Sequence, residues 1–281
     1  MRLIHLTDPH LSSPDFPLRG RSHYGKRYLG LASWRRRRRF KHRREWLDEL
    51  VTSAKAQQPE LFVVTGVLVH IGLPEEIEQA GEWLRSLGDP DQVVLVPGNH
   101  DNYAADSWSA ISECWGAYLG DVRAGGYPFT RKYQELELLG VSTALPTRPG
   151  SACGLVGEQQ LAALAKRLET PRTGPRFLAI HHPPFPGMIS FRKRLRDADC
   201  LEAITTVENT DVILHGHDHT DREALHRGVR VFGTSSASYQ RGSFRRFDIA
   251  PVDHGWRVEM NLFRRQDAGE YVSAQKQCWQ V

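Results

Sequence analysis

Side chains that can bind metal ions follow five short apolar runs of this sequence. Eight of the thirteen histidines lie in these stretches, together with aspartates and one asparagine. Imidazole and carboxylate ligands suit Mn, Fe, Co, Ni or Zn, and a set without thiolates is not typical of a structural zinc site. The pattern therefore predicts a metal-dependent site. In chain order the residues are Asp8, His10, His70, Asn99, His100, Asp101, His181, His182, His215, His217, Asp218 and His219.

Each of these motifs, taken alone, also has an ordinary structural explanation. Asp8 and His10 could belong to a turn, and the His-His-Pro-Pro stretch that begins at His181 could be a stiff surface loop. His217 and His219 are stronger evidence, because alternate residues of an extended segment face the same side. A purely structural explanation would have to place all the motifs at strand ends by chance. The combined pattern therefore favours a binding site.

The elements that must position these residues alternate between strands and helices. Short β-rich apolar runs end at polar, Gly or Pro residues, and longer segments carry apolar residues at helical spacing. This alternation predicts an α/β layered domain, in which ligands collect where strands end. The region 229–263 is mostly strand-like, and Trp279 of the tail is expected to pack on the body. The expected strands are Leu3–Leu6, Leu61–Val64, Val93–Val96, Phe177–Ile180, Val212–Leu214 and Val229–Phe232, and the expected helices are Arg43–Ala56, Glu75–Leu87 and Gly157–Leu168.

The composition is that of a soluble globular protein, which we expect to fold as one domain over residues 1–281. Hydrophobic residues make up 40% of the chain and charged residues 25%. No apolar run approaches the roughly 18–20 residues of a membrane-spanning helix, and the N-terminus lacks the pattern of a secretory signal. The four cysteines lie far apart without a CxxC pair, which argues against a zinc ribbon or a disulfide scaffold. A reducing cytoplasm is the expected location.

Positive charge is concentrated in one segment. Residues 19–44 contain twelve Lys or Arg and no Asp or Glu, so a net charge of +4 for the whole chain leaves −8 on the other 255 residues. Aromatic residues alternate with these cations, which suits either an anionic membrane surface or an ordinary solvated basic helix. A nucleic-acid partner is not expected, because the rest of the chain would repel a long polyanion. We expect the region at about 15–46 to be an insertion that caps the site.

Together the motifs resemble those of the calcineurin-like metallophosphoesterases, which carry D-x-H, G-D, G-N-H-D, H-x-P and G-H-x-H in this order, each at a strand end. The matches run from Asp8 to His219 and cover most of the chain. The resemblance implies a four-layer α/β/β/α sandwich with two divalent metal ions, such as Mn, Fe or Zn. Two such ions neutralise phosphate oxygens and stabilise both ends of an in-line displacement.

The resemblance also implies roles for individual residues. His100 would be the catalytic histidine, oriented by Asp101. The family's ligand in the fourth motif usually lies two residues before a proline, which favours His181 and leaves His182 as the alternative. The implied ligands are Asp8, His10 and His219 for one ion, and Asn99, His181 and His217 for the other.

One position departs from the family pattern. Where the family has an aspartate that bridges the two ions, this chain has Val67, which can neither ligate nor supply charge. The second ion keeps only neutral ligands, so we expect this chain to hold one ion more readily than two. Three hypotheses compete: a deliberate Asp→Val change that inactivates the enzyme, a natural variant with one ion or a recruited ligand such as His70, and a non-catalytic protein. The intact state of the other motifs favours the first hypothesis.

The motifs define a reaction class, hydrolysis of a phosphodiester or pyrophosphate bond, better than they define a substrate. Our first hypothesis is a lipid-linked nucleotide pyrophosphate at the inner membrane surface, like the UDP-diacylglucosamine cleaved in lipid A synthesis. Basic and apolar stretches at 19–46 and 185–195 would receive its acyl chain and headgroup. The alternatives are a soluble cyclic-nucleotide or general phosphodiesterase, and a module that binds phosphate ligands without turnover. Candidate substrate contacts are Trp34, Arg35, Arg192 and Arg194.

Overall fold

Two six-stranded mixed sheets form the centre of the protein, for which the computed structural model describes residues 1–11, 25–120 and 126–281. The first sheet has the spatial order β12 (Tyr271–Gln280), β11 (Trp256–Arg265), β10 (Ser243–Pro251), β1 (Arg2–Leu6), β2 (Leu61–Val64) and β3 (Val93–Leu95). Strands β1 to β3 are parallel, and β10 to β12 add antiparallel strands on one side.

The second sheet has a parallel centre with an antiparallel strand at each edge. Its spatial order is β4 (Phe129–Tyr133), β5 (Leu136–Val141), β6 (Arg176–Ile180), β7 (Val212–His215), β9 (Val229–Gly233) and β8 (Arg222–His226). Every residue of β5, β6 and β7 is buried. Strands covered on both faces need apolar residues at nearly every position, which is why their sequences are apolar except at Glu137, Arg176 and His215.

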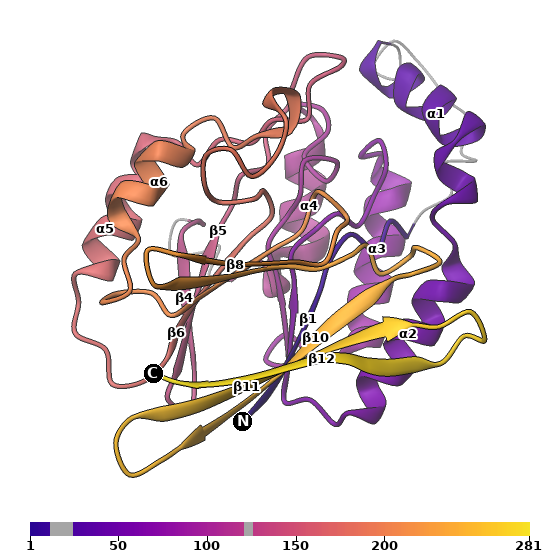
Figure 1. Cartoon of the computed structure of the whole chain (residues 1–281). Helices are drawn as coiled ribbons and strands as arrows, with labels where there is room; N and C mark the ends of the chain where they lie inside the picture. The colour runs from indigo at the N-terminus through magenta and orange to yellow at the C-terminus, as the bar shows by residue number, and fades with distance from the viewer. Residues whose placement is uncertain (12–24, 121–125) are drawn as a thin grey trace.

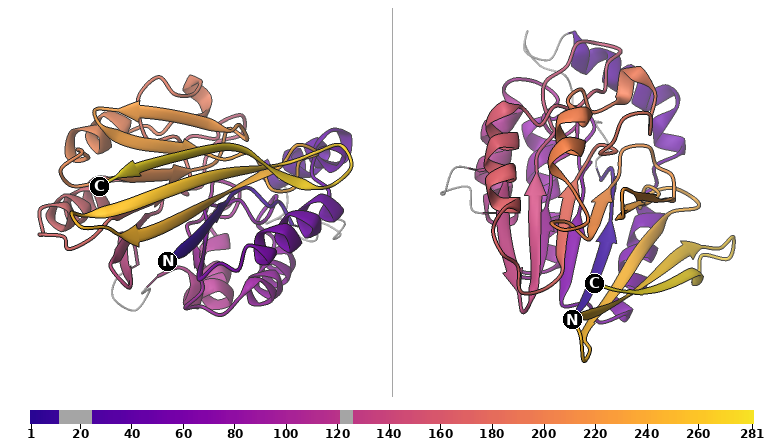
Figure 2. Two further views of the ribbon diagram at one scale, coloured as in Figure 1. Left: turned by 60° about the horizontal axis from the view of Figure 1, so that its bottom comes forward. Right: turned by 60° about the vertical axis from the view of Figure 1, so that its left-hand side comes forward.

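The described residues form six α-helices, most of which cover the outer faces of the sheets. They are α1 (Lys26–Arg36), α2 (Arg44–Ala56), α3 (Pro74–Leu87), α4 (Ser107–Trp115), α5 (Glu158–Leu168) and α6 (Ala198–Ile204), with short 3₁₀ turns η2 (Arg38–Phe40), η3 (Gly116–Tyr118) and η5 (Phe191–Lys193). Helices α2, α3 and α4 pack on the first sheet, and α5 and α6 on the second (Figures 1 and 2). This arrangement confirms the expected four-layer sandwich. Within the described segments, no helix is long and apolar enough to cross a membrane.

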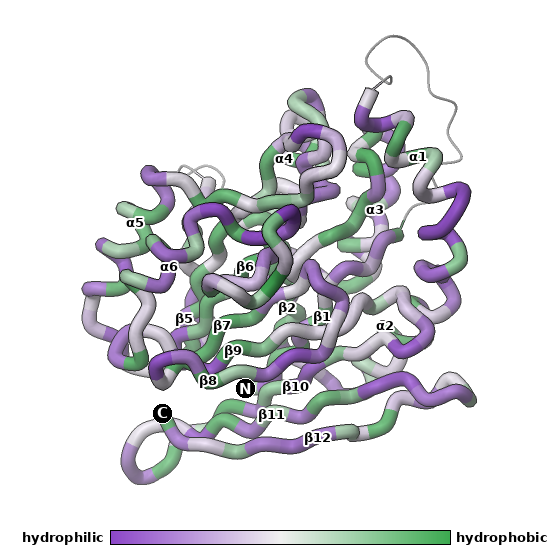
Figure 3. The backbone as a smooth tube through the Cα atoms, turned by 45° about the horizontal axis from the view of Figure 1, so that its top comes forward, coloured by the Kyte–Doolittle hydropathy of each residue, from purple (hydrophilic) through white to green (hydrophobic). Residues whose placement is uncertain are grey.

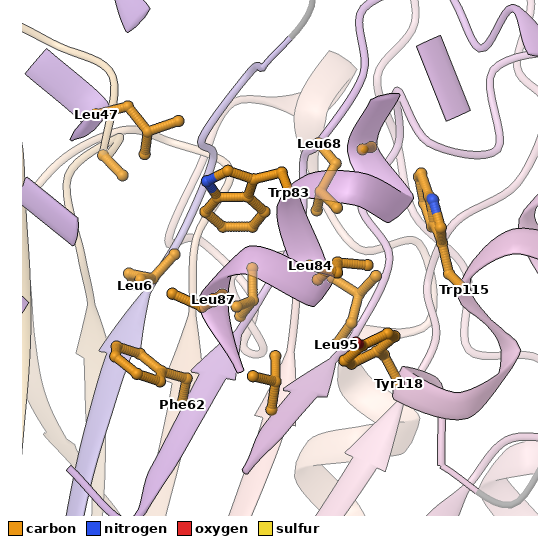
Figure 4. Packing of buried hydrophobic residues seen from close by; sticks show 14 of the residues in the cluster. Leu6, Leu47, Phe62, Leu68, Trp83, Leu84, Leu87, Leu95, Trp115 and Tyr118 are labelled. Atoms are coloured by element: carbon orange, nitrogen blue, oxygen red, sulfur yellow. The ribbon is translucent and has the colours of Figure 1, made fainter. Parts of the chain in front are cut away.

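Three apolar layers, one between the sheets and one outside each sheet, hold the sandwich together. Between the sheets, the ring of Phe177 meets the ring of Phe247 edge-on at a centroid distance of 5.6 Å. Outside the first sheet, Trp83 and Leu87 of α3 belong to the same apolar cluster as Leu6 of β1 and Phe62 of β2 (Figure 4). Burial of side chains of this size contributes about 1.5–3 kcal/mol each. The sheets are therefore rigid supports for the loops at their ends.

The expected strands and helices match the observed ones within one residue at each end. Strand β12 was not expected, because its residues are mostly exposed and polar. Figure 3 shows the hydropathy of the residues along this strand. Trp279 does pack on the body, where its ring stacks on Phe232 at 5.8 Å. That residues 1–281 form one domain stays a prediction.

The basic segment is described from residue 25 onward, as α1, η2 and the turn that leads into α2. Both chain termini lie at one end of the sheets, and α1 stands at the other (Figure 1). Arg27 anchors α1: its guanidinium donates to both carboxylate oxygens of Asp106 at 2.8–2.9 Å and to the carbonyls of Ile71 and Gly72. Part of the basic character is therefore structural rather than available to a ligand.

A buried carboxylate shapes the loop that follows β2. Glu76 of α3 is fully buried and accepts hydrogen bonds from the backbone N–H groups of His70, Ile71 and Leu73, all at 3.0 Å. A buried N–H group without an acceptor is costly, so this loop depends on the carboxylate.

We expect Glu76→Ala to lower the free energy of unfolding by about 3 kcal/mol, because three backbone donors lose their acceptor. Urea denaturation measures the change, with Glu78→Ala, on the exposed face of the same helix, as the control. Equal stability of the two variants would show that the carboxylate does not hold the loop.

Candidate metal centre

The first cluster consists of Asp8 and His10, after β1, and His219, after β7. The Nε2 atoms of the two histidines lie 3.5 Å apart, and Oδ1 of Asp8 lies 3.8 Å from His10 Nε2 and 3.3 Å from His219 Nε2. Ligands about 2.1 Å from a common ion lie about 3–3.5 Å from one another. The first cluster therefore has the spacing of metal ligands.

The second cluster consists of Asn99, His181 and His217. Its three donor atoms, Asn99 Oδ1, His181 Nε2 and His217 Nδ1, form a triangle with sides of 3.0–3.1 Å. Nδ1–H of His181 donates to the carbonyl of Thr65 at 2.7 Å, so Nε2 presents its lone pair to the triangle. The structure thus brings together, in two clusters, the six residues that the sequence motifs predict as ligands.

His182 lies next to His181 but is engaged elsewhere. Its Nε2–H donates to the carbonyl of Ala152 at 3.1 Å, and its Nδ1 accepts from the hydroxyl of Thr143 at 2.7 Å. With both ring nitrogens occupied, His182 has no lone pair for an ion. The geometry favours His181 as the ligand.

The carboxylate of Asp8 fits a cation. Its Oδ2 accepts from the hydroxyl of Thr7 at 2.8 Å and from the N–H of His217 at 2.9 Å. Its Oδ1 is buried and has no hydrogen-bond partner in the part of the chain that the structure describes. Burial alone would raise the pKa of Asp8, but His219, His181 and the N–H of His217 hold it well below its usual range. An ionised oxygen is thereby directed into the first cluster.

Two imidazoles of the clusters, those of His10 and His217, have lowered pKa values. Burial, followed by the nearby charges of His42 and His70, lowers the pKa of His10 well below its usual value, and burial followed by His182 and His181 does the same for His217. A neutral imidazole is the form that binds a metal ion.

The ligands sit on unusual backbone. Asp8, His10, His217 and His219 have φ angles of 51°, 44°, 74° and 56°, a region that non-glycine residues seldom adopt and that is concentrated at functional sites. A side chain on Gly216, between β7 and His217, would overlap the hydroxyl of Thr7. The loop after β7 therefore approaches the loop after β1 so closely that only glycine fits at position 216.

His100 is held by a backbone carbonyl rather than by Asp101. Its Nδ1–H donates to the carbonyl of His70 at 2.6 Å, and its Nε2 accepts from Nη1 of Arg38 at 2.8 Å. The expectation that Asp101 orients His100 is not what the contacts show. The Asp101 carboxylate accepts instead from the N–H groups of Leu68, Val69 and Gly98 at 2.7–3.2 Å.

Val67 lines the same cavity as both clusters and is 1% exposed. Its Cγ2 lies so close to Gly98 that a side chain at that glycine would overlap it. The ring of His70, the recruited ligand considered above, stacks on His10 at a centroid distance of 4.8 Å. Stacked rings direct their lone pairs along parallel planes, so His70 is not placed to complete the first cluster.

Cations from the basic segment and from η5 surround this site. One cavity of about 500 Å³ is lined by all the metal-ligand candidates except the fully buried His181, and a neighbouring cavity of about 440 Å³ shares Asn99 and His100 with it. The cationic residues that line the two cavities are Lys26, Arg37, Arg38, Lys41, Arg192 and Lys193. Of these, only Arg192 is one of the substrate contacts expected from the sequence.

Three of the expected substrate contacts lie elsewhere. Trp34 is 5% exposed and packs its ring on His70 at 3.9 Å, so it belongs to the core. Arg35 is exposed and does not line either cavity, and Arg194 stacks over the ring of Phe191 at 4.0 Å. The pattern of arginines beside aromatic residues indicated a surface but not which side chains face the site.

The calcineurin-like phosphoesterase family matches residues 1–221. A cAMP/cGMP dual specificity phosphodiesterase of Mycobacterium tuberculosis is 28% identical over 247 residues, which cover 84% of this chain and 67% of that protein. A glycerophosphodiester phosphodiesterase of Enterobacter lignolyticus is 30% identical over 136 residues, covering 46% of this chain and 44% of that protein.

A solved structure supports the fold. The purple acid phosphatase of yellow lupin superposes with a TM-score of 0.58 at 11% identity, over 97% of this chain and 52% of that one.

Substitution of the adjacent histidines distinguishes the two candidate ligands. In a Val67→Asp chain, we expect His181→Ala to weaken the second of two Co²⁺-binding events at least about tenfold, because it removes a ligand. His182→Gln should leave both events unchanged, since the ring nitrogens of His182 bind other groups. Titration calorimetry measures both affinities, and the opposite result would make His182 the ligand.

Proposed function

The chain belongs to the calcineurin-like phosphoesterase family, and on that basis we propose that it is a metal-dependent phosphodiesterase acting on a small phosphodiester such as a cyclic nucleotide. The observation that carries this proposal is the placement of both donor clusters and several cations around one cavity. A cavity of about 500 Å³ is within the range of about 300–1,000 Å³ that small-ligand sites occupy.

Divalent ions, which the family typically uses, would be held by the first and second clusters and would supply positive charge for the phosphate oxygens. The cations on the wall add to that charge. Arg38, whose guanidinium already lies 2.8 Å from Nε2 of His100, would donate to a phosphate oxygen, because guanidinium groups form strong charge-assisted hydrogen bonds with phosphate.

His100 would supply a proton to the leaving oxygen. Burial and the charge of Arg38 lower its pKa well below the usual value, so Nε2 carries a lone pair before substrate arrives. A bound phosphate opposes the effect of Arg38 and favours protonation of Nε2. The protonated ring then faces the phosphoryl group as a general acid.

The relatives favour this function over the lipid-linked pyrophosphate hypothesis, because their names refer to cyclic nucleotides and glycerophosphodiesters. A lipid-like substrate remains a second candidate for one reason. Large apolar side chains on the elements that border the cavities are exposed: Tyr28, Leu29, Phe40 and Phe191. Assay of cyclic nucleotides, glycerophosphodiesters and a lipid pyrophosphate side by side separates the candidates. A membrane partner and a cytoplasmic location stay predictions.

We expect Val67→Asp to raise the number of bound ions per chain toward two and to raise kcat/KM for a phosphodiester about 100-fold, because it restores a charged ligand. Elemental analysis and turnover of bis(4-nitrophenyl) phosphate measure the two effects, with Val67→Asn as the uncharged control. If neither quantity changes, the hypothesis of a deliberate Asp→Val substitution is wrong.

In the Val67→Asp chain, Arg38→Ala should lower kcat/KM about 10- to 100-fold, because a charge-assisted hydrogen bond contributes about 1.5–3 kcal/mol. The control is Arg39→Ala, since Arg39 is exposed and lies over Phe40. Equal losses in both variants would indicate a general effect of charge rather than a contact with substrate.

A further inference from the structure

A histidine from the basic segment lies beside the first cluster. His42, between η2 and α2, is 6% exposed and lines the cavity that contains Asp8, His10 and His219. Its ring centroid lies 4.0 Å from that of His10 and 5.5 Å from that of His219. One ring nitrogen of each of these three histidines lies within 4.8 Å of the other two. Together, the first cluster and His42 offer three imidazoles and one carboxylate to an ion.

A hydrogen bond fixes which nitrogen of His42 is free. Its Nδ1 lies 2.7 Å from Oγ of Ser238, in the loop between β9 and β10. When Nδ1–H donates to that oxygen, Nε2 carries the lone pair, and metal-binding histidines commonly have their other nitrogen held in this way. The carbonyl of Ser238 also accepts from the N–H of Arg43 at 2.9 Å. The loop thus positions the ring of His42 and the backbone of the next residue, Arg43.

The first cluster lacks a fourth protein ligand, and His42 is placed to supply one. Asp8, His10 and His219 provide three donors, and an ion bound by three protein ligands has room for a fourth. The family's bridging aspartate would supply it, but Val67 has no donor atom. His42, in the turn between η2 and α2, offers a ring nitrogen to the same cluster.

We propose that His42 is the fourth protein ligand of the metal ion at the first cluster and takes the coordination place that Val67 leaves. Three imidazoles with one carboxylate select a transition ion such as Zn²⁺ or Co²⁺ over Mg²⁺ or Ca²⁺, which prefer oxygen ligands. This inference deepens the proposed function and rests on the same metal site, but its measurements do not depend on turnover.

Ligation by His42 would also organise the phosphate-binding wall. The N–H groups of Lys41 and His42 both donate to the carbonyl of Arg38, at 2.9 and 3.0 Å. An ion bound to His42 therefore restrains the turn that carries Arg38, whose guanidinium contacts His100. Metal binding and the placement of Arg38 become coupled.

Titration of the full-length protein with Co²⁺ tests the proposal, because its visible absorption reports both affinity and coordination. We expect His42→Gln to weaken the tight site about 100-fold and to change the spectrum, and Ser238→Ala, which only frees the ring, to weaken it about tenfold. His254→Gln, at an exposed position, should match the unsubstituted chain. Circular dichroism checks folding, and Ser238→Ala carries the test if His42→Gln does not fold.

Trypsin provides a second readout. Co²⁺ should slow cleavage at residues 35–39 in the unsubstituted chain and in His254→Gln, but not in His42→Gln. Unchanged cobalt affinity, spectrum and protection in His42→Gln would overturn the role of His42 while leaving the proposed function intact. Failure of the unsubstituted chain to bind Co²⁺ would overturn both.

Discussion

The convergence of metal-binding donor atoms on a small buried space is the constraint on which the rest of the structure depends. In the second cluster two imidazole nitrogens and an amide oxygen lie 3.0–3.1 Å apart, and in the first a carboxylate oxygen faces two more imidazoles. Buried acceptors that face one another are unfavourable unless a cation lies between them. The stability of the sandwich must therefore offset the cost of this arrangement, and a bound ion would remove that cost.

The scaffold meets this demand with buried hydrogen bonds behind the site. Asp101 fixes the loops after β2 and β3 through three backbone N–H groups, and Glu76 does the same for residues 70–73. Carbonyls of Thr65 and His70 then orient His181 and His100. Such supporting contacts set the direction of each donor more tightly than a loop alone can.

The sequence predicts strands β1, β2, β3, β6, β7 and β9 and the convergence of the six candidate ligands, because these strands are mostly apolar and the candidate ligands follow strand ends. It does not predict β5, whose apolar residues are interrupted by Glu137. It does not predict β12, whose edge position permits a polar sequence. It does not distinguish Arg38 from the neighbouring arginines or mark His42 as part of the site, because their positions depend on the path of the chain through α1 and η2. Trp34 was misplaced for the same reason: its flanking arginines suggested a surface, but its ring faces His70.

The most direct measurement is the anomalous diffraction of crystals grown with Co²⁺. We expect a strong anomalous peak among Asp8 Oδ1, His10 Nε2 and His219 Nε2, and a weaker one at the triangle of Asn99, His181 and His217. Peaks only elsewhere on the molecule, with both clusters empty at saturating Co²⁺, would contradict a metal centre at this edge of the sheets.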